Sequence, residues 1–599
     1  MNSKAPKNSD RLKNAFFVWI LPVFLALLYF IIASTAIHGK SMTQDEKYHI
    51  TRGIILLETG DLRLNIHHPY IANVLNALPL YLFEDVELPS ENSLAWQEGN
   101  KDLFTDELMQ ANGGELEFAS QYIFQARLVS IFITSIFIFF FYTFIRRCWG
   151  ITEAVISTIL LAFSPTFLAH GALATTDIFS AITIFMATAA LWRYMVTDLD
   201  EKVSRRWALA LFILASFLAL MSKYSAVPLA LLWLLILWLD GIKRYAASFG
   251  TYAKTNNTRW RTFIHSVAQS SFIVLLVAVS WVGLMFMAYR LEFGTMQQTV
   301  LYQDNSSFDT NYQVDKDSLI FADQLQYIFE EVQLPFPHYF RGFMENVILH
   351  NVNQHETFFI GQYKDIPPTY HLGAFLLKEP VITVAFSIFS ITILGYYGVL
   401  SALNHINARK ESVVRHRIPV AFPILFALVP AFIFITISFS SIKLGIRHIA
   451  PVLPFIYMAS GVVVAYYFRR QIVARVLVIV ALALIALDIL FAYPEYVNYF
   501  STAIGGDRNG YKYLHDSNLD WGQNEFMVEE YIDEHPAYDA QYRPGTIERG
   551  RYYVISVSEL FGDPLYVPRY ALELHEMYDS GELKLVDWIS NTHWVVYTE

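Results

Sequence analysis

The chain has 599 residues, of which 54% are hydrophobic and only 16% are charged. No ordinary soluble domain has this composition, which instead predicts a protein that lies in a membrane. The formal net charge of −11 comes without a basic stripe or a recognised nucleic-acid motif, so we expect no nucleic-acid partner.

Long apolar runs predict membrane-spanning helices, because a hydrocarbon core roughly 30 Å thick needs about 20 helical residues. The first run is too long for the core of a signal peptide and no small-residue cleavage site follows it, so we expect an anchor. The sequence predicts about eleven spans. They lie near residues 15–37, 124–145, 151–169, 178–196, 207–222, 225–239, 263–289, 372–401, 418–439, 449–468 and 471–491.

Lysine and arginine gather in alternate gaps between these spans, which marks the cytoplasmic side. The basic gaps include Lys4–Lys13, Arg146-Arg147, Lys202–Arg206, Lys243–Arg261, Arg409–Arg417 and Arg469-Arg470. The pattern predicts a multi-pass protein of the plasma or inner membrane with a cytoplasmic amino terminus and an extracytoplasmic carboxyl terminus. Cys148 is the only cysteine, which excludes a disulfide framework and a thiolate metal cluster.

Three long polar segments are predicted to face outward, at about 38–122, 291–371 and 492–599. We expect residues 1–491 to form the transmembrane domain and residues 492–599 a small extracytoplasmic α/β or α+β domain. In the last segment, residues 551–558 and 593–597 have strand-like patterns, and residues 524–534 and 570–578 look helical.

Asp45 and Glu46 follow the first predicted span, at the lip of the membrane. A carboxylate there could deprotonate an acceptor hydroxyl beside a lipid-bound substrate. His67 and His68 come later in the same segment. Adjacent histidines cannot usually both ligate one ion, so a contact with a phosphate or with Asp45 is favoured over a metal site, and a plain solvated loop is the alternative.

Asp177 lies at the outer start of the fourth predicted span. An ionisable group at a span is costly, ~3 kcal/mol at the helix centre, and is a functional hypothesis by default. The alternative is a helix cap, in which the carboxylate would satisfy free amide groups at the start of the span.

Several basic side chains lie on the outer face, where the charge rule disfavours cations. At outer helix ends they could bind the phosphate group of a lipid, or they could simply extend toward anionic headgroups. They are Arg127, Lys223, Lys378, Lys443 and Arg447, the last followed by His448.

The tail carries Gly505-Gly506, which indicates a turn, and the stretch Asp516–Gln523, which indicates a loop ordered by side-chain to backbone bonds. A structural role for this stretch is favoured over a contribution to acceptor binding.

The order and common sidedness of these motifs resemble the GT-C membrane glycosyltransferases, especially the protein O-mannosyltransferase and aminoarabinose transferase group (glycosyltransferase family 39-like). The resemblance covers roughly residues 15–225, parts of 371–455, and 493–523. It is carried by Asp45-Glu46, Gly60-Asp61, His67-His68-Pro69, Arg127, Ser164-Pro165, Thr176-Asp177 and Asp516–Gln523.

The resemblance implies a GT-C fold and inverting transfer of a sugar from a polyprenyl-phosphate donor to an acceptor outside. It implies that Asp45 is the catalytic base, that Glu46 and Asp177 position acceptor, base or donor, and that Arg127 and Lys223 lie near the site. Aminoarabinose transferases commonly show His-Lys-Pro-Pro, whereas this chain has His67-His68-Pro69-Tyr70. Phosphate binding would then fall to a protonated His68, or to Lys378, Lys443 or Arg447.

No cofactor or bound metal is expected to be required, although a divalent cation stays an alternative. Two other functions remain open: a polytopic transporter, and a non-catalytic subunit of an envelope assembly. A transporter is disfavoured because neither repeat symmetry nor broken helices are evident in the sequence. The acceptor could be a lipid, a glycan or a protein hydroxyl, and the sequence does not identify the sugar.

Overall fold

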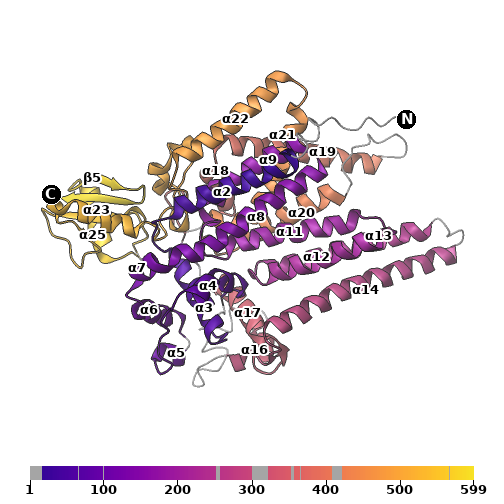
Figure 1. The fold of residues 1–599 in the computed structure, drawn as a ribbon, viewed down its shortest axis with the longest axis horizontal. Helices are drawn as coiled ribbons and strands as arrows, with labels where there is room; N and C mark the ends of the chain where they lie inside the picture. The colour runs from indigo at the N-terminus through magenta and orange to yellow at the C-terminus, as the bar shows by residue number, and fades with distance from the viewer. Residues whose placement is uncertain are drawn as a thin grey trace.

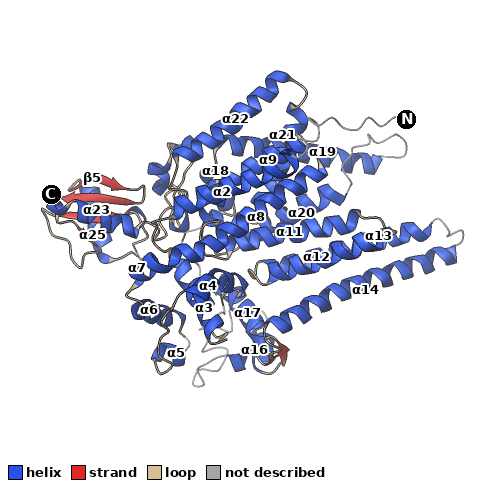
Figure 2. Cartoon of the chain, viewed as in Figure 1, coloured by secondary structure: helices blue, strands red, loops and turns tan. Residues whose placement is uncertain are grey.

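The computed structural model is mostly helical, with a small sheet near its carboxyl end (Figure 1, Figure 2). It describes residues 16–64, 67–98, 100–250, 256–299, 322–352, 357–363, 366–407, 421–564 and 567–599.

Eight helical segments of the described chain are long and apolar enough to cross a membrane. They contain or form α2 (Leu21–Ile37, after the π-helical turn Phe16–Ile20), α8 (Phe124–Cys148), α11 (Asp177–Val196), α12 (Lys202–Leu220), α13 (Ala226–Gly250), α14 (Asn256–Ala288), α19 (Val381–Asn407) and α22 (Ile472–Phe491). Three further predicted spans fall on shorter helices, which are α9 (Ile151–Ala162), α20 (Ala421–Ser438) and α21 (Leu453–Phe468). The total of eleven stays a prediction.

Two predicted spans are interrupted by proline. The span expected at 151–169 ends as α9, and α10 (Pro165–His170) begins anew with the Ser164 hydroxyl accepting a hydrogen bond from the amide of Phe167. The span expected at 372–401 divides into α18 (Tyr370–Lys378) and α19, because Pro380 lacks the amide hydrogen that a continuous helix needs. The expectation of unbroken spans was therefore wrong at these two places.

The two interruptions meet inside the protein. Ser164 and Thr166 donate hydrogen bonds of 2.9 and 2.7 Å to the same oxygen of the buried Glu379. These hydrogen bonds link the two helix breaks. They also give buried polar groups partners that a purely apolar interior would not provide.

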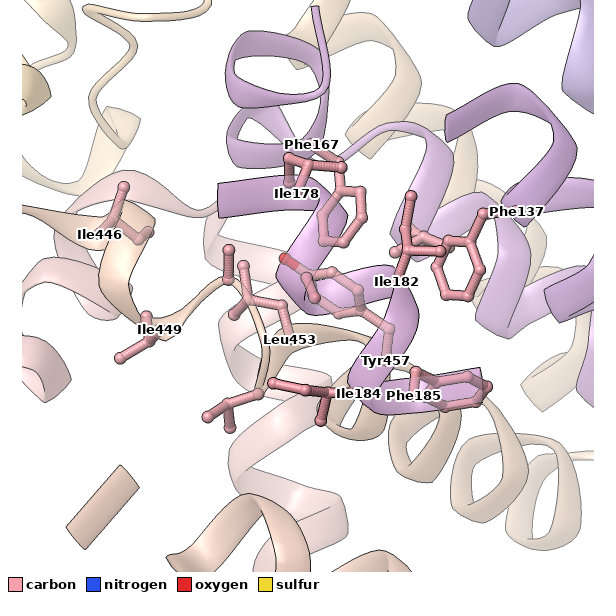
Figure 3. Close-up of a cluster of buried hydrophobic side chains, with 14 of the residues drawn as sticks. Phe137, Phe167, Ile178, Ile182, Ile184, Phe185, Ile446, Ile449, Leu453 and Tyr457 are labelled. Carbon is pink, nitrogen blue, oxygen red and sulfur yellow. The ribbon is translucent and has the colours of Figure 1, made fainter. Parts of the chain in front are cut away.

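The helices pack closely around aromatic and small residues. Phe137 of α8 and Phe185 of α11 lie with ring centroids 5.7 Å apart beside Tyr457 of α21 (Figure 3). At the crossing of α9 and α21, a Cβ added to Gly461 would lie 2.1 Å from the hydroxyl oxygen of Ser157. A small residue is therefore required at this approach, as is common between membrane helices.

The polar segments between the spans fold into shorter elements. After α2 come α3 (Gln44–Glu58), α4 (Ile71–Phe83), α5 (Leu94–Glu98), α6 (Lys101–Ala111), α7 (Glu115–Phe118) and the π-helical turn Ala119–Ile123. After α14 come β1 (Phe293–Gly294), the 3-10 turn Gln297–Thr299, α16 (Ala322–Glu330), β2 (Leu334–Pro335) and α17 (Pro337–Val352).

The tail begins with the 3-10 turns η7 (Thr502–Ile504), η8 (Asp507–Lys512) and η9 (Asp516–Asn518) and then forms a mixed sheet. The strand order is β3-β4-β6-β5, with β3 parallel to β4 and the other pairs antiparallel. The elements are α23 (Glu525–Glu534), η10 (Pro536–Tyr538), β3 (Gln541–Tyr542), β4 (Tyr552–Ser556), α24 (Val557–Leu560), α25 (Arg569–Ser580), β5 (Leu583–Ile589) and β6 (His593–Thr598).

The strands and helices expected in the tail are thereby confirmed, while its independence as a domain stays a prediction. Alternate residues of β6 point to opposite faces of the sheet: Val595 packs with Val528 of α23, whereas Trp594 belongs to the core that contains Leu574 of α25. Figure 1 shows this sheet and helices α3 to α7 near the same end of the long helices.

Candidate functional site

The adjacent acids of α3 point to different surroundings. Thr43 and Glu46 form a capping box at the start of α3, in which the amide and hydroxyl of Thr43 both donate to Glu46 at 2.9 Å. The same carboxylate accepts two hydrogen bonds from the Arg127 guanidinium, at 2.8 and 2.7 Å, and one from the amide of Ala174 at 2.8 Å. Glu46 and Arg127 are fully buried, and the carboxylate has its hydrogen-bonding capacity filled by the protein.

Arg127 also donates to the carbonyl oxygens of Lys40 and Ser41, at 2.8 and 2.7 Å. Its fork of donors therefore ties the segment before α3 to α8. This geometry does not fit the expectation that Arg127 contacts a substrate phosphate, or that Glu46 touches the acceptor. Both residues position the start of α3.

Asp45, in contrast, lies in a charge row, in which acids and cations alternate. Its members are Asp45, Arg447, Asp177 and Lys223. Oδ2 of Asp45 accepts a hydrogen bond of 2.5 Å from Nη1 of Arg447, a residue 402 positions away in the sequence. The same Nη1 lies 3.7 Å from Oδ2 of Asp177, and the other Asp177 oxygen is 2.5 Å from Nζ of Lys223. Four residues from separate segments thus meet at the helix ends.

Exposure distinguishes the two acids in this row. The side chain of Asp45 is 34% exposed and that of Asp177 only 3%. Thr176 occupies the cap position of α11 and Asp177 is its first residue, so the interpretation of Asp177 as a helix cap was wrong. Its carboxylate holds Lys223 and Arg447 instead, and Asp45 is the acid that an incoming molecule can reach.

The electrostatics keep Asp45 ionised. Burial alone would raise the pKa of Asp45, but the charge and hydrogen bond of Arg447, helped by His49, hold the pKa below its usual value of 3.8. The two acids in turn raise the pKa of Arg447 despite its burial. The cluster is therefore charged at neutral pH.

The tail stretch 516–523 lies across this row. The amide of Gln44 donates to the carbonyl oxygen of Trp521 at 2.9 Å, and that of Ser41 to Gln523 at 3.1 Å. The guanidinium carbon of Arg447 lies 4.2 Å from the Trp521 ring centroid, a separation at which a cation and an aromatic face attract each other.

The same stretch holds the backbone before Arg447. The amide of Ile446 donates to Oδ1 of Asn518 at 3.0 Å, and the Ser517 hydroxyl donates to the carbonyl of Leu444. Gly445 has φ +109°, and an added Cβ would lie 2.8 Å from the Ser517 hydroxyl, so glycine is required there. The predicted structural role for the stretch thus has a physical basis: it joins the Asp45 segment to the Arg447 segment.

His49 is a neighbour of Asp45 that the sequence interpretation missed. It lies four residues after Asp45 on α3, bonds the side chain of Asn73 at 2.8 Å, and stacks on His68 with centroids 5.5 Å apart. Burial lowers the pKa of His49 to about 4. The helical spacing of positions 45 and 49 was the available signal.

Burial also lowers the pKa values of His67, His68 and His448 well below their usual value. These side chains are therefore neutral at neutral pH, which does not favour a protonated His68 as the phosphate partner. His67 also accepts a hydrogen bond from Asn346 at its carbonyl oxygen, and the ring of His448 lies 6.1 Å from that of His371.

Two of the other predicted cations have protein partners. The buried Lys378 ammonium donates to the carbonyls of Val497 and Asn518, at 2.8 and 2.5 Å, and so links α18 to the tail. Lys443 donates to the carbonyl of Ser440 at 2.9 Å. The geometry gives Lys378 a structural role and leaves Lys223, whose side chain is 20% exposed, as the more accessible lysine.

Two further cations near Asp45 were also missed. Arg52 lies seven residues after Asp45, hence on the same face of α3, and Lys101 begins α6. Both approach the Tyr48 ring, at 5.8 and 5.5 Å from its centroid. Burial lowers the pKa of Arg52 to about 10, although Asp45 opposes this shift. Arg52 lies in the middle of α3 and not at the end of an apolar span, so hydrophobic length gives no signal for it.

Within the described ranges, no group of three or more His, Cys, Asp or Glu side chains has an arrangement that could hold a metal ion. The described residues therefore offer no candidate metal centre, either within the charge row or elsewhere.

Apolar helices with a charged cluster at their ends define a multi-pass membrane protein with a polar site at one end of its bundle. Residues 116–256 match the family model described as dolichyl-phosphate-mannose-protein mannosyltransferase. This match confirms the resemblance to GT-C membrane glycosyltransferases. The helix breaks at Pro165 and Pro380 mean that an absence of broken helices no longer counts against a transporter, whereas the matched family is one of mannosyltransferases. No curated protein sequence matches the chain significantly.

Two solved structures are similar to the chain. ArnT from Cupriavidus metallidurans, bound to undecaprenyl phosphate, has 12% identity and a TM-score of 0.40, over 96% of this chain and 97% of that one. The archaeal oligosaccharyltransferase AglB from Archaeoglobus fulgidus, in complex with an inhibitory peptide and a dolichol-phosphate, has 14% identity and a TM-score of 0.41, over 85% of this chain and 59% of that one.

Proposed function

We propose that the protein transfers a sugar from a polyprenyl-phosphate donor to an acceptor at the outer face of the membrane, with inversion and with Asp45 as the base. The observation that carries this proposal is the partly exposed Asp45 carboxylate, held ionised by Arg447 in a cluster that also contains Asp177 and Lys223. The dolichyl-phosphate-mannose family match supports the choice of donor class.

The chemistry follows from the charges. A polyprenyl phosphate is a competent leaving group, so no acid has to protonate it. Asp45 accepts the proton of the acceptor hydroxyl as the new bond to the sugar forms. Lys223 and Arg52 supply positive charge beside it, where the departing phosphate gains negative charge. Asp177 keeps Arg447 and Lys223 in place.

The overall assignment is tested by comparing the glycans and lipids of a deletion strain with those of the parent strain by mass spectrometry. We expect one sugar to disappear from its acceptor and its polyprenyl-phosphate form to accumulate, with both changes reversed by the wild-type gene. Unchanged glycans and carrier lipids would contradict the proposal. The missing product would also identify the sugar and the acceptor, including whether the acceptor is lipid, glycan or protein.

The pH dependence of transfer should be flat between about pH 6 and 8. The pKa of Asp45 lies below 3.8 and that of His49 is about 4, so neither group changes charge in this range. Because the base must be deprotonated, kcat/KM should fall only in acid, as the pH approaches these pKa values. An acid limb with an apparent pKa of 6 to 7 would instead point to a histidine base.

Trp521 is a positioning residue for Arg447, because its ring contacts the Arg447 guanidinium. Trp521→Ala should lower kcat about 5- to 30-fold, which corresponds to a cation–π interaction of roughly 1–2 kcal/mol. Trp521→Phe keeps an aromatic face and should restore most of the rate. Equal losses in both variants would show that the ring does not act through Arg447.

A further inference from the structure

A pocket lies in the tail and shares no residue with the charge row. It has a volume of about 340 Å³ and lies between η8, the end of α25 and one face of the β5–β6 hairpin. This volume falls within the range of small-molecule sites, roughly 300–1,000 Å³. The pocket wall includes aliphatic residues of β5 and β6. Its polar and aromatic residues are Arg508, Asn509, Tyr511, Tyr578, Trp588 and Trp594.

Aromatic rings from four different elements form the wall. The Trp594 ring lies with its centroid 5.3 Å from Trp588, 5.7 Å from Tyr511 and 5.9 Å from Tyr578. Trp588 and Tyr511 are steeply inclined to Trp594, at 76° and 78°, so that they do not form one flat stack. Tyr578 is 41% exposed, which leaves aromatic surface uncovered by the protein.

Hydrogen-bond donors accompany these rings without being used by the protein. Trp594 is only 4% exposed, yet its indole nitrogen has no hydrogen-bond partner among the described residues. Arg508 is exposed and forms no ion pair within the described chain; its guanidinium carbon lies 5.7 Å from the Trp588 ring centroid. A purely apolar occupant would take water away from the Arg508 guanidinium without offering it an acceptor.

We propose that this pocket binds a saccharide ring. A pyranose has an apolar C–H face, which can lie on the exposed faces of Trp588 or Tyr578, and a rim of hydroxyls that accept hydrogen bonds. The exposed Arg508 guanidinium supplies donors for that rim. Both halves of the wall are therefore used by one ligand class, whereas a lipid chain would use only the rings.

The pocket is also connected to the charge row through the chain. Arg508 and Tyr511 belong to η8, which residues 513–515 connect to the stretch 516–523 that contacts Arg447. A saccharide that is part of the acceptor would thus be held by the same segment that orders the site. This second step rests on the proposed function, while saccharide binding itself does not.

The test uses the full chain in lipid nanodiscs, because maltoside detergents would themselves occupy a saccharide site. Methyl glycosides of mannose, glucose, galactose and N-acetylglucosamine, and their disaccharides, are titrated by saturation-transfer NMR and calorimetry. We expect at least one to bind, and Trp588→Ala to weaken its binding at least tenfold. Arg508→Ala, at an exposed position where folding is not at risk, should weaken it as well.

Tyr531→Ala is the matched control, since Tyr531 is an aromatic residue of α23 on the opposite face of the sheet; binding should be unchanged. Asp45→Asn should bind glycosides as the wild type does. Absence of binding by every probe, or binding that neither pocket variant affects, would overturn the proposal. If no saccharide bound at the pocket but sugar transfer were intact, only the pocket assignment would fail. If saccharides bound at the pocket but no sugar were transferred, only the proposed function would be contradicted.

Discussion

Asp45→Asn should abolish sugar transfer while the protein still folds and inserts. Asparagine has nearly the same shape and can still accept a hydrogen bond from Arg447, but it cannot take up the acceptor proton. Loss of a general base typically costs about 10²- to 10⁴-fold in rate. We expect kcat and kcat/KM to fall together with little change in KM, because the interaction lost is made only in the transition state.

The measurement is transfer from a polyprenyl-phosphate sugar in membranes that contain equal amounts of each variant. Asp106→Asn is the matched control: Asp106 is an exposed acid of α6 in the same polar segment, and its replacement should leave the rate unchanged. Full activity of Asp45→Asn would refute the catalytic role and would favour a non-catalytic subunit.

Glu46→Gln and Arg127→Met should each strongly destabilise the protein, although neither residue is proposed to touch the substrate. Each substitution leaves the partner as an uncompensated buried charge, which costs about 3–5 kcal/mol. Total stabilities are commonly only about 5–15 kcal/mol. We therefore expect a lower yield of folded protein and a shorter half-life on heating, measured by fluorescence-detected size-exclusion chromatography.

The double variant Glu46→Leu/Arg127→Met removes both charges and should recover a large part of the lost stability, since apolar replacement of a whole buried pair is often tolerated. Arg549→Ala breaks the exposed ion pair between Arg549 and Glu582 and should change stability by less than about 1 kcal/mol. If the two single substitutions in the buried pair were as mild as this control, the structural role given to Glu46 and Arg127 would be wrong.

The local sequence was sufficient to predict the helices and strands whose hydrophobic pattern lies within one short stretch of the chain. The apolar runs at 15–37 and 471–491 became α2 and α22 because each contains enough consecutive apolar residues to cross a membrane. The alternating stretch at 593–597 became β6 for a similarly local reason. Pro165 and Pro380 are helix-breaking residues in the sequence, but a prediction from hydrophobicity alone does not detect the interruptions that they cause.

Within the site, residue type and position in the chain were enough to single out Asp45, Asp177, Lys223 and Arg447, because charged groups at the ends of apolar helices are conspicuous. What the sequence did not separate was Asp45 from Glu46, two neighbouring acids of the same chemical type. Glu46 is buried and accepts hydrogen bonds from Arg127, Thr43 and the amide of Ala174. Only the folded chain brings these groups together.

The sequence by itself therefore determined that this is a many-helix membrane protein with acids and cations at predicted helix ends, since hydrophobic length and residue type are properties of the chain alone. The tertiary structure decided which acid is accessible, which cations are already paired, and that the tail segment around Trp521 joins Asp45 to Arg447. Those outcomes depend on distances between residues hundreds of positions apart, and such distances are set by packing.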